Sequence, residues 1–400
     1  MICRRDMWIA LVLSIAAVIV SPYIKPPWLL SIVAILICAL FYAVRDTKYS
    51  AIGISVVSIL YGAGLISLMV FLGTITIVII GEASYRIVRK EKYRLPAQIG
   101  VVCISSALLM IYLNYYAVLV PITGIIVALM LKSILRKRED AIMIECIGVC
   151  MTMFLFEDIS YTADTDLILL AIIISFTFGI ISYKMKAADL SGLFSAALMG
   201  ILIIVFSDIS WFFVMLAFFI LGSAFTKYKY EKKKSEGVAE SRGGVRGFLN
   251  VFANGLVSLC AAVLFGIYQD PLFAALYLGS VSAAMADTTA SELGMLGKTP
   301  RLITTFKKVP KGTDGGVTLF GEAAATIAAF ILCMIAYALN MATFEIAVTG
   351  ILAGFVGTNV DSLAGATLER RGIIQNTGTN FICTLSGGLF AVLLYILNIF

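Results

Sequence analysis

The sequence predicts an all-α integral membrane protein, a polytopic bundle of about fifteen transmembrane helices. Hydrophobic residues make up 61% of the 400 residues and charged residues only 14%, whereas soluble proteins average roughly 45–50% apolar and about 25% charged residues. The apolar residues also fall into runs, and a helix needs about 20 such residues to cross a bilayer. This composition excludes a soluble globule, a disordered chain and a secreted disulfide scaffold.

A series of apolar segments gives the candidate membrane spans in chain order. They are residues 7–20, 28–44, 51–80, 95–113, 117–131, 141–156, 167–182, 190–206, 211–225, 248–267, 272–286, 317–339, 344–360 and 381–400. The first resembles a signal peptide but lacks a small-residue cleavage site, so we expect an uncleaved helix. The third is long enough to turn back at Tyr61-Gly62-Ala63-Gly64 as a short hairpin, which brings the total to about fifteen.

Lys and Arg predict the orientation of these spans. From residue 82 onward they occur only in alternate loops, within residues 86–94, 132–138, 184–186, 227–246, 298–311 and 370–371. The intervening loops contain none, and one of them, residues 157–166, is acidic. Because basic loops stay on the cytoplasmic side, we expect a protein of the cell membrane whose basic loops face the cytoplasm.

The absence of histidine narrows the chemistry. It excludes His-based acid–base catalysis, Ser-His-Asp triads and His metal sites. The eight cysteines are scattered without a CxxC pair, which is typical of small buried hydrophobes. Polar residues collect only after Lys186, so we divide the chain into residues 1–186, a transmembrane region without an assigned role, and residues 187–400, a candidate catalytic domain.

The first polar cluster is a basic loop that leads into a membrane helix. Its segment Arg242-Gly243-Gly244-Val245-Arg246 sets two guanidinium groups beside flexible backbone, a pattern suited to phosphate oxygens. Asn250 and Asn254 follow inside an apolar run, where an amide needs a partner. The alternative is that the loop, including Lys232–Lys234, fixes topology or contacts anionic headgroups.

The second cluster, Asp287-Thr288-Thr289-Ala290-Ser291-Glu292, directly follows an apolar run. Asp287 and Ser291 share a helix face at i,i+4, and Glu292 is close enough to approach the same site. A carboxylate at the membrane boundary is a candidate Mg²⁺ ligand, because Mg²⁺ binds one or two carboxylates together with substrate phosphates. The alternative is that Asp287 only caps a helix.

Two further clusters lie on the same predicted side. Residues 300–318 carry hydroxyls, lysines and Gly315-Gly316 before a helix N-terminus, which favours an anion. A Walker A motif is absent, and a glycine-rich linker is the alternative.

In residues 354–366, small residues at intervals of three or four allow close helix packing, but packing does not explain Asp361. A second carboxylate beside Asp287 predicts a shared metal, and Glu322 is a further buried acid.

These clusters together contain the parts of a phosphoryl-transfer site. Such a site needs carboxylates for Mg²⁺ and cationic or N–H groups for phosphates, and it does not need histidine. The membrane setting suggests that one substrate is a lipid.

Four sequence blocks resemble the phytyl-phosphate kinase family, in the family's order and over roughly residues 187–400. They are GSAFTKYKYEKK, GGVRGFLNVFANG, ADTTASELGMLGKTPRLITTFKKVPKGTDGGVTLFG and GFVGTNVDSLAGATLERR. The family is more distantly similar to dolichol kinases and phosphatidate cytidylyltransferases. The resemblance implies Mg²⁺-assisted phosphorylation of an isoprenyl monophosphate, such as phytyl or geranylgeranyl phosphate, by CTP or another nucleoside triphosphate.

The resemblance also implies roles for individual residues. Asp287, Asp361 and Lys307 are the expected catalytic residues, and Asp287, Glu292 and Asp361 are the expected Mg²⁺ ligands. The expected nucleotide- and phosphate-binding residues are Lys227, Arg242, Arg246, Asn250, Asn254, Arg301, Thr313, Gly315, Gly316 and Asn380. Val245 and Leu249 depart from the family pattern in the first cluster, where many relatives have arginine and glutamine.

Two other functions fit the same residues. A CTP-dependent cytidylyltransferase would join CMP to a lipid phosphate and release pyrophosphate. A lipid or solute transporter would also have many spans and intramembrane polar residues, but the matching interrupted helices of an internal repeat are absent from the sequence. We predict the membrane, a nucleotide and an isoprenyl phosphate as partners, and no nucleic acid.

Overall fold

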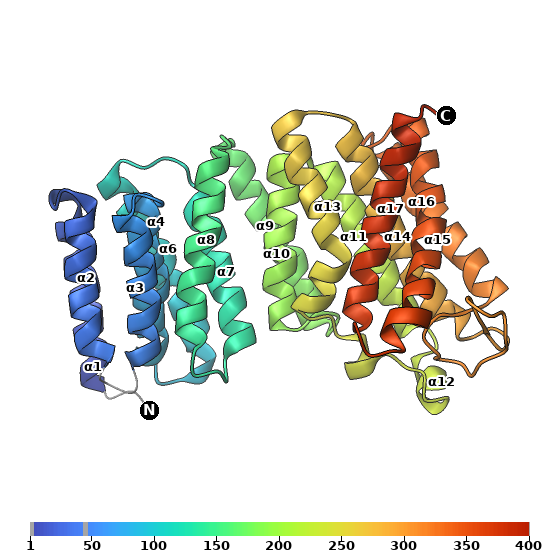
Figure 1. Ribbon diagram of the computed structural model, residues 1–400, viewed down its shortest axis with the longest axis horizontal. Helices are drawn as coiled ribbons and strands as arrows, with labels where there is room; N and C mark the ends of the chain where they lie inside the picture. Colours follow the sequence, from blue (N-terminus) through green and yellow to red (C-terminus); the bar gives the residue numbers. More distant parts are fainter. Residues whose placement is uncertain (1–3, 43–46, 400) are drawn as a thin grey trace. The chain divides into compact units, whose positions relative to one another are not determined.

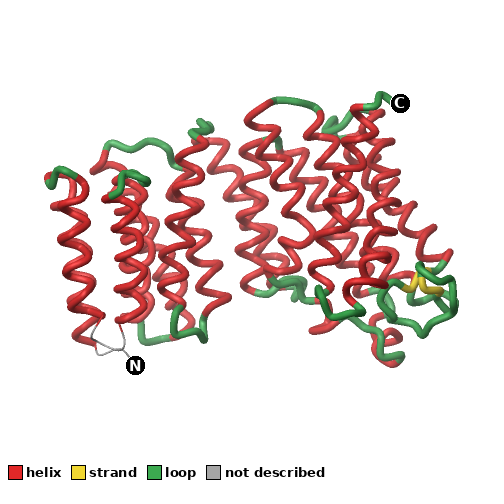
Figure 2. The backbone as a smooth tube through the Cα atoms, viewed as in Figure 1, coloured by secondary structure: helices red, strands yellow, loops and turns green. Residues whose placement is uncertain are grey.

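The computed structural model describes residues 4–42 and 47–399. The chain forms two compact units, Met1–Thr165 and Asp166–Phe400. Figure 2 shows that nearly all of the described chain is helical. The exception is a ribbon in which β1 (Arg301–Leu302) pairs antiparallel with β2 (Gly316–Val317). These features confirm the all-α membrane prediction. The functional boundary predicted near Lys186 lies inside the second unit.

The first unit is a series of helices and their connections (Figure 1). They are α1 Arg4–Val20, α2 Pro27–Tyr42, α3 Lys48–Gly62, α4 Leu68–Ile75, α5 Gly81–Ile87, α6 Glu91–Leu113, α7 Leu119–Leu135 and α8 Ala141–Ile159, with a short 3₁₀ turn η1 at Ser21–Tyr23. A π-helical stretch, η3 (Thr76–Ile80), joins α4 to α5, so that Leu68–Ile87 forms one continuous span.

The predicted hairpin within residues 51–80 is confirmed. Helix α3 ends at Gly62, and Gly64 has a φ of +74°, a left-handed conformation that glycine adopts without steric cost. Ser67 then starts α4, because its side chain accepts a hydrogen bond from the Val70 N–H. The second arm continues to Ile87, beyond the predicted end at residue 80.

The second unit contains the remaining helices. They are α9 Thr165–Lys184, α10 Leu190–Phe206, α11 Ile209–Lys227, α12 Tyr230–Ser235, η4 Ser241–Gly244, α13 Phe248–Tyr268, α14 Leu272–Gly294, α15 Leu319–Ala338, α16 Phe344–Ala364, η5 Gly365–Glu369 and α17 Asn376–Ile396. Helix α14 packs against α11, α13, α15, α16 and α17. Its residues Tyr277, Leu278 and Ala283 have no exposed surface, so α14 is the centre of this unit.

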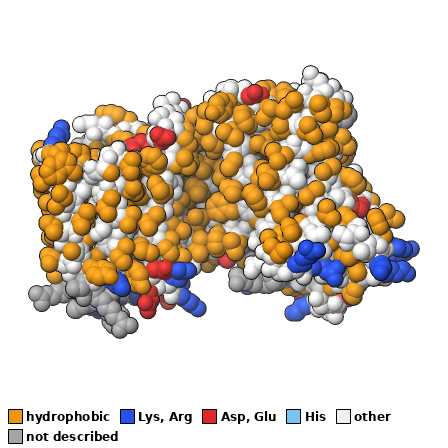
Figure 3. All heavy atoms as spheres, viewed as in Figure 1, with side chains coloured by type: hydrophobic (Ala, Val, Ile, Leu, Met, Phe, Trp, Pro, Cys, Tyr) orange, Lys and Arg blue, Asp and Glu red, His pale blue; other side chains and the backbone are white. Residues whose placement is uncertain are grey.

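Eight helices in the described part of the chain are long and apolar enough to cross a membrane. They are Leu68–Ile87, Glu91–Leu113, Thr165–Lys184, Ile209–Lys227, Phe248–Tyr268, Leu319–Ala338, Phe344–Glu369 and Asn376–Ile396. Shorter apolar helices, together with α3, α8 and α14, account for the other predicted segments. In each unit, the Lys and Arg side chains visible in Figure 3 gather mainly at one end of the helices, as the alternating loops predict.

Candidate functional site

Two carboxylates from different helices meet near the end of α14. Asp287 of α14 and Asp361 of α16 are both partly buried. Their carboxylate oxygens and the thiol of Cys383 on α17 all lie within 4.8 Å of one another. The two aspartates that end separate apolar runs in the sequence are therefore neighbours in the fold.

Small residues one helical turn away bring these helices together. A Cβ added to Gly357 of α16 would lie 2.5 Å from the Cβ of Ala283 on α14, and one added to Gly387 of α17 would lie equally close to the same atom. Asp287 follows Ala283 by four positions on α14, and Asp361 follows Gly357 by four positions on α16. Each aspartate therefore lies on the same helix face as that contact residue. The glycines therefore serve the packing role considered above, and that packing sets the spacing of the carboxylates.

Replacement of Gly357 by alanine is expected to destabilise the second unit. A methyl group there overlaps Ala283, and overpacking of this kind costs about 1–3 kcal/mol. Thermal unfolding of the detergent-purified protein measures the loss. Gly100→Ala is the matched control, because a Cβ at Gly100 meets no atom within 4 Å. Equal apparent melting temperatures for the two variants would contradict the packing argument.

The carboxylate pair fits a divalent cation. Asp361 Oδ1 is buried and has no hydrogen-bond partner among the described residues, and Asp287 Oδ1 accepts only a long hydrogen bond, 3.5 Å, from Thr358 Oγ1. Buried carboxylates without a partner are costly. Two carboxylates and open positions for phosphate oxygens are the ligands that Mg²⁺ takes. The Cys383 thiol is a soft donor, unsuited to Mg²⁺, and lies 3.6 Å from the Ala283 carbonyl oxygen.

A cavity of about 190 Å³ opens beside the two aspartates. Its wall consists of the last turns of α14, the loop that leads to β2, the first turn of α15, the end of α16 with η5, and Asn376 at the start of α17. Ser291 lines it with Asp287, as their i,i+4 spacing predicts. The charged lining residues are Asp287, Asp314, Glu322, Asp361, Glu369 and Lys311. Because carboxylates outnumber the single ammonium, a phosphate group needs accompanying cations to enter.

The predicted glycine loop forms part of this wall. Thr313, Gly315 and Gly316 all line the cavity. Gly315 has a φ of +75°, and a Cβ there would lie 2.6 Å from both the Ser362 carbonyl oxygen and the Ala366 nitrogen. Only glycine allows this close approach. The loop is thereby held against the end of α16, next to Asp361.

Several predicted residues do not line this cavity in the described part of the chain. They are Lys227, Arg246, Asn250, Asn254, Glu292, Arg301, Lys307 and Asn380. Lys307 is exposed on the loop between the two strands, whereas Lys311 lines the cavity and pairs with Glu236 at 3.1 Å. Asn376, one turn before Asn380, is the asparagine at the cavity.

The other basic residues of the prediction have separate environments. The exposed Arg301 donates a 2.9 Å hydrogen bond to the Phe306 carbonyl oxygen, and Lys227 donates one of 3.2 Å to the Met185 carbonyl oxygen. The side chain of Arg242 lies outside the described residues. These contacts bring neither Arg301 nor Lys227 to the carboxylate pair.

Three residues of the first polar cluster line a second cavity in the same unit. Arg246, Asn250 and Asn254 face a mostly apolar space of about 80 Å³ between α9, α10, α11 and α13. The Arg246 guanidinium lies over the rings of Phe218 and Phe219, 5.4 and 5.6 Å from their centroids. Burial lowers the pKa of this guanidinium, and nearby carboxylates oppose the shift. Arginine nevertheless stays protonated, so this cavity combines a fixed positive charge with apolar walls.

The positive end of this second cavity lies close to α14. A Cβ added to Gly222 would lie 2.9 Å from Arg246 Nη2 and 3.4 Å from Thr288 Cγ2. Thr288 follows Asp287 directly in the chain. Arg246 therefore lies near the turn of α14 that carries Asp287.

Glu292, the third expected metal ligand, lies in a different contact. Its carboxylate is 2% exposed and forms a buried salt bridge with Lys233 of α12. The Lys233 ammonium also donates to the carbonyl oxygens of Phe225 and Thr226, at 2.9 and 3.1 Å. The sequence predicts that Lys232–Lys234 fix topology or contact anionic headgroups, whereas Lys233 anchors the basic loop to α14.

The comparisons with known proteins place the chain in a family. It matches the family described as "Integral membrane protein DUF92" over residues 173–388. The chain belongs to this family. The match confirms the resemblance found in the sequence blocks. The matched residues include Asp287 and Asp361, as well as Lys311 of the first cavity and Arg246 of the second. The first unit lies outside it.

Several known proteins are similar to the chain. An uncharacterized membrane protein of Methanocaldococcus jannaschii is 38% identical over 53% of this chain and 87% of its own length. Protein VTE6, chloroplastic, of Arabidopsis thaliana is 33% identical over 51% of this chain and 64% of its own length. Protein PGR of the same plant is 31% identical over 54% of this chain and 92% of its own length. No solved structure matches the chain.

Sequence reasoning missed several residues of the first cavity. Asp314 and Glu369 bring two further carboxylates to it, and Lys311 brings its ammonium. Asp314 lies between Thr313 and Gly315, so its neighbours in the sequence were the available signal. Glu369 stands directly before Arg370-Arg371 and is easily assigned to the charged loop.

Proposed function

We propose that the protein is a membrane kinase that transfers the γ-phosphoryl group of CTP, or of another nucleoside triphosphate, to an isoprenyl monophosphate and so forms the diphosphate. Phytyl and geranylgeranyl phosphate are the proposed acceptors. The observation that carries the proposal is the paired Asp287 and Asp361 at an acidic cavity, close to an apolar cavity headed by Arg246. Membership of the family and the resemblance to isoprenyl-phosphate kinases support it.

The two cavities would divide the substrates between them. Asp287 and Asp361 would hold Mg²⁺, which neutralises nucleotide phosphates when bound. Lys311 and the Thr313–Gly316 loop line the space for those phosphates. The apolar walls around Arg246 suit the isoprenyl chain, and the guanidinium suits its phosphate. We propose that the nucleotide enters from the cytoplasm, because the loops around this site carry the Lys and Arg that predict that side.

The transfer needs little acid–base chemistry from the protein. An oxygen of the acceptor phosphate is already ionised at neutral pH, so no general base has to remove a proton before it attacks. The new bond joins this oxygen to the γ-phosphorus, and the bond to the bridging oxygen of the nucleotide breaks. The nucleoside diphosphate leaves with the electron pair. This account fits a chain without histidine.

Product analysis tests the proposal. Purified full-length protein with geranylgeranyl phosphate, CTP and Mg²⁺ should yield geranylgeranyl diphosphate and CDP in equal amounts, and parallel reactions with ATP, GTP and UTP identify the preferred donor. A CMP-linked lipid with pyrophosphate would instead identify a cytidylyltransferase. Lipid or solute flux in liposomes without nucleotide consumption would identify a transporter and contradict the kinase.

A further inference from the structure

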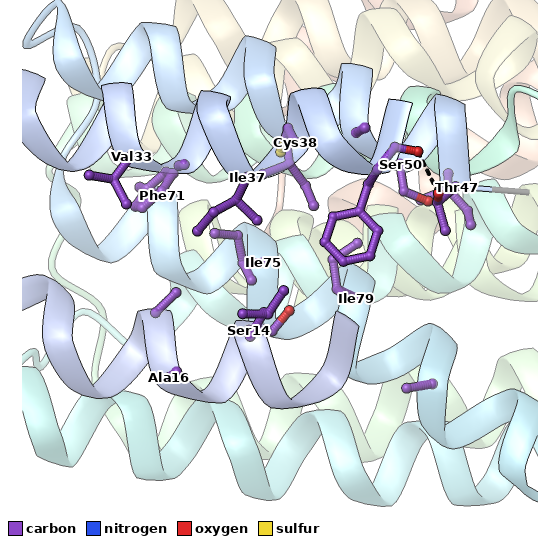
Figure 4. A pocket seen from close by; sticks show the side chains of 18 of the residues that line it. Ser14, Ala16, Val33, Ile37, Cys38, Thr47, Ser50, Phe71, Ile75 and Ile79 are labelled. Carbon is purple, nitrogen blue, oxygen red and sulfur yellow. Dashed lines mark hydrogen bonds between the residues drawn. The ribbon is translucent and has the colours of Figure 1, made fainter. Parts of the chain in front are cut away.

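The first unit, which lies outside the family match, encloses an apolar cavity of about 300 Å³. Helix α1 forms one wall, α2 and α3 form the opposite wall, and α4, η3 and α5 complete it. Figure 4 shows Val33, Ile37, Phe71, Ile75 and Ile79 pointing into this space. Drug-sized ligands occupy pockets of about 300–1,000 Å³, so the cavity is large enough to hold part of a hydrocarbon chain.

The cavity changes from apolar to polar along its length. Ser50 and Thr47 lie at one end of the view in Figure 4, away from Val33 and Phe71. From Phe71 to Glu82 at the polar end, the continuous helix rises at most about 17 Å at about 1.5 Å per residue, because part of it is π-helical. That length is about half of a ~30 Å hydrocarbon core. The cavity from its apolar to its polar end therefore has about the depth of one leaflet.

The polar end continues into another cavity of the first unit, of about 500 Å³, which we call the headgroup cavity. The two cavities share the lining residues Ser50, Glu82, Arg86 and Ile142, and so adjoin. The Lys, Arg and Glu residues that line the headgroup cavity are Glu82, Arg86, Arg94, Lys132, Arg136, Arg138, Glu139 and Glu145. Five positive groups and three carboxylates line it, and two of the positive groups, Arg136 and Arg138, pair with Glu91 and Asp140 outside the lining.

Beside these pairs, the three positive groups Arg86, Arg94 and Lys132 outnumber the two carboxylates of Glu82 and Glu145. The single Glu82 carboxylate pairs with both Arg86 and Lys132. Arg94 has no carboxylate partner among the described residues; its Nε donates 3.0 Å to the Val88 carbonyl oxygen, and its guanidinium lies over the Tyr85 ring. Its remaining N–H groups are available to an anion. Guanidinium groups bind phosphate oxygens in paired hydrogen bonds.

We infer that the first unit is a second binding site, for a lipid whose headgroup carries a phosphate group. The hydrocarbon chain occupies the cavity between α1 and α2–α3, and the phosphate lies among Arg86, Arg94 and Lys132. The inference rests on these adjoining cavities and not on the proposed kinase activity. An isoprenyl phosphate and the membrane lipid phosphatidate both offer the required chemistry.

Alkylation of Cys38 tests this inference on the full-length protein. Cys38 lines the apolar cavity and is buried, whereas Cys103 is exposed and lines neither cavity. Geranylgeranyl phosphate or dioleoyl phosphatidate should slow the reaction of Cys38 with N-ethylmaleimide at least about tenfold and leave Cys103 unchanged, with peptide mass spectrometry as the readout. Comparison of the two lipids at equal concentration identifies the preferred source. Equal protection by geranylgeraniol, which lacks the phosphate, would overturn the inference.

Matched variants locate the headgroup. Arg94→Gln should weaken the protection by lipid phosphates about tenfold, which corresponds to about 1.4 kcal/mol. Arg89→Gln, an exposed arginine outside both cavities, should not weaken it. Ala34→Trp, which fills the apolar cavity, should reduce protection by either lipid. Equal behaviour of Arg94→Gln and Arg89→Gln would contradict the site. Protection should persist in Asp287→Asn, so failure of the kinase proposal and failure of this one are distinguishable.

Discussion

Asp287→Asn is expected to lower nucleotide-dependent phosphorylation about 10²–10³-fold or more. The asparagine keeps the shape of the side chain but removes one of the two charges that would hold Mg²⁺, and loss of a single electrostatic contact to a transition state costs this much in other enzymes. Asp361→Asn should behave in the same way. Steady-state turnover with geranylgeranyl phosphate and CTP, over a range of Mg²⁺ concentrations, measures both effects.

Stability separates this catalytic effect from misfolding. Asp361 Oδ1 is buried without a partner among the residues that the structure describes, and the Asp287 carboxylate lies within 4.8 Å, so removing one of the two charges relieves repulsion. The apparent melting temperature of either Asn variant in the absence of Mg²⁺ should therefore equal or exceed that of the parent. Asp208→Asn is the control, because Asp208 caps α11 by accepting a 2.8 Å hydrogen bond from the Ser210 N–H, which asparagine can also accept. Full turnover in Asp287→Asn would contradict the assigned role.

Lys233→Met is expected to destabilise the second unit by about 3–5 kcal/mol, the cost of leaving a buried charge without its partner. Lys233 is 1% exposed, and its ammonium contacts the Glu292 carboxylate and two carbonyl oxygens. The substitution keeps the length of the side chain but leaves Glu292 unpaired. Thermal or denaturant unfolding in detergent measures the change.

A double-variant cycle distinguishes the ion pair from simple packing. Lys233→Met combined with Glu292→Gln should recover most of the lost stability, because no unpaired charge remains. Lys232→Met is the control, since its side chain is exposed. Equal stability of Lys233→Met and Lys232→Met would show that the buried pair contributes nothing. A recovery of activity with stability would also show that Glu292 is not an essential metal ligand.

Much of the fold was predictable because its signals are local. The apolar runs form helices, and Gly64 marks the turn within residues 51–80, because glycine adopts a positive φ at a turn without steric cost. Asp287 and Asp361 were also predictable, since a carboxylate that ends an apolar run needs a reason to be there. Their pairing depended on two helices ending at the same side of the membrane.

The remaining part of the site depended on helix rotation and loop path, which the sequence does not specify. Glu292 lies five residues after Asp287, about 140° further round the helix at 3.6 residues per turn, so it faces Lys233 instead of the cavity. Asn376 reaches the cavity and Asn380 does not, a difference of one turn at the start of α17. Lys311, near the end of the loop that leads to β2, lines the cavity, whereas Lys307 is exposed near β1.

The excess of carboxylates around the first cavity has a consequence for ligand selection. A free nucleotide and the wall of this cavity carry charge of the same sign, so they repel each other, whereas the same nucleotide already complexed with divalent ions carries less negative charge. For the proposed kinase, the cavity would therefore favour entry of the metal complex over that of the bare polyanion. Uncomplexed nucleotide in excess would then compete poorly, and the cellular level of free divalent ions would control occupancy.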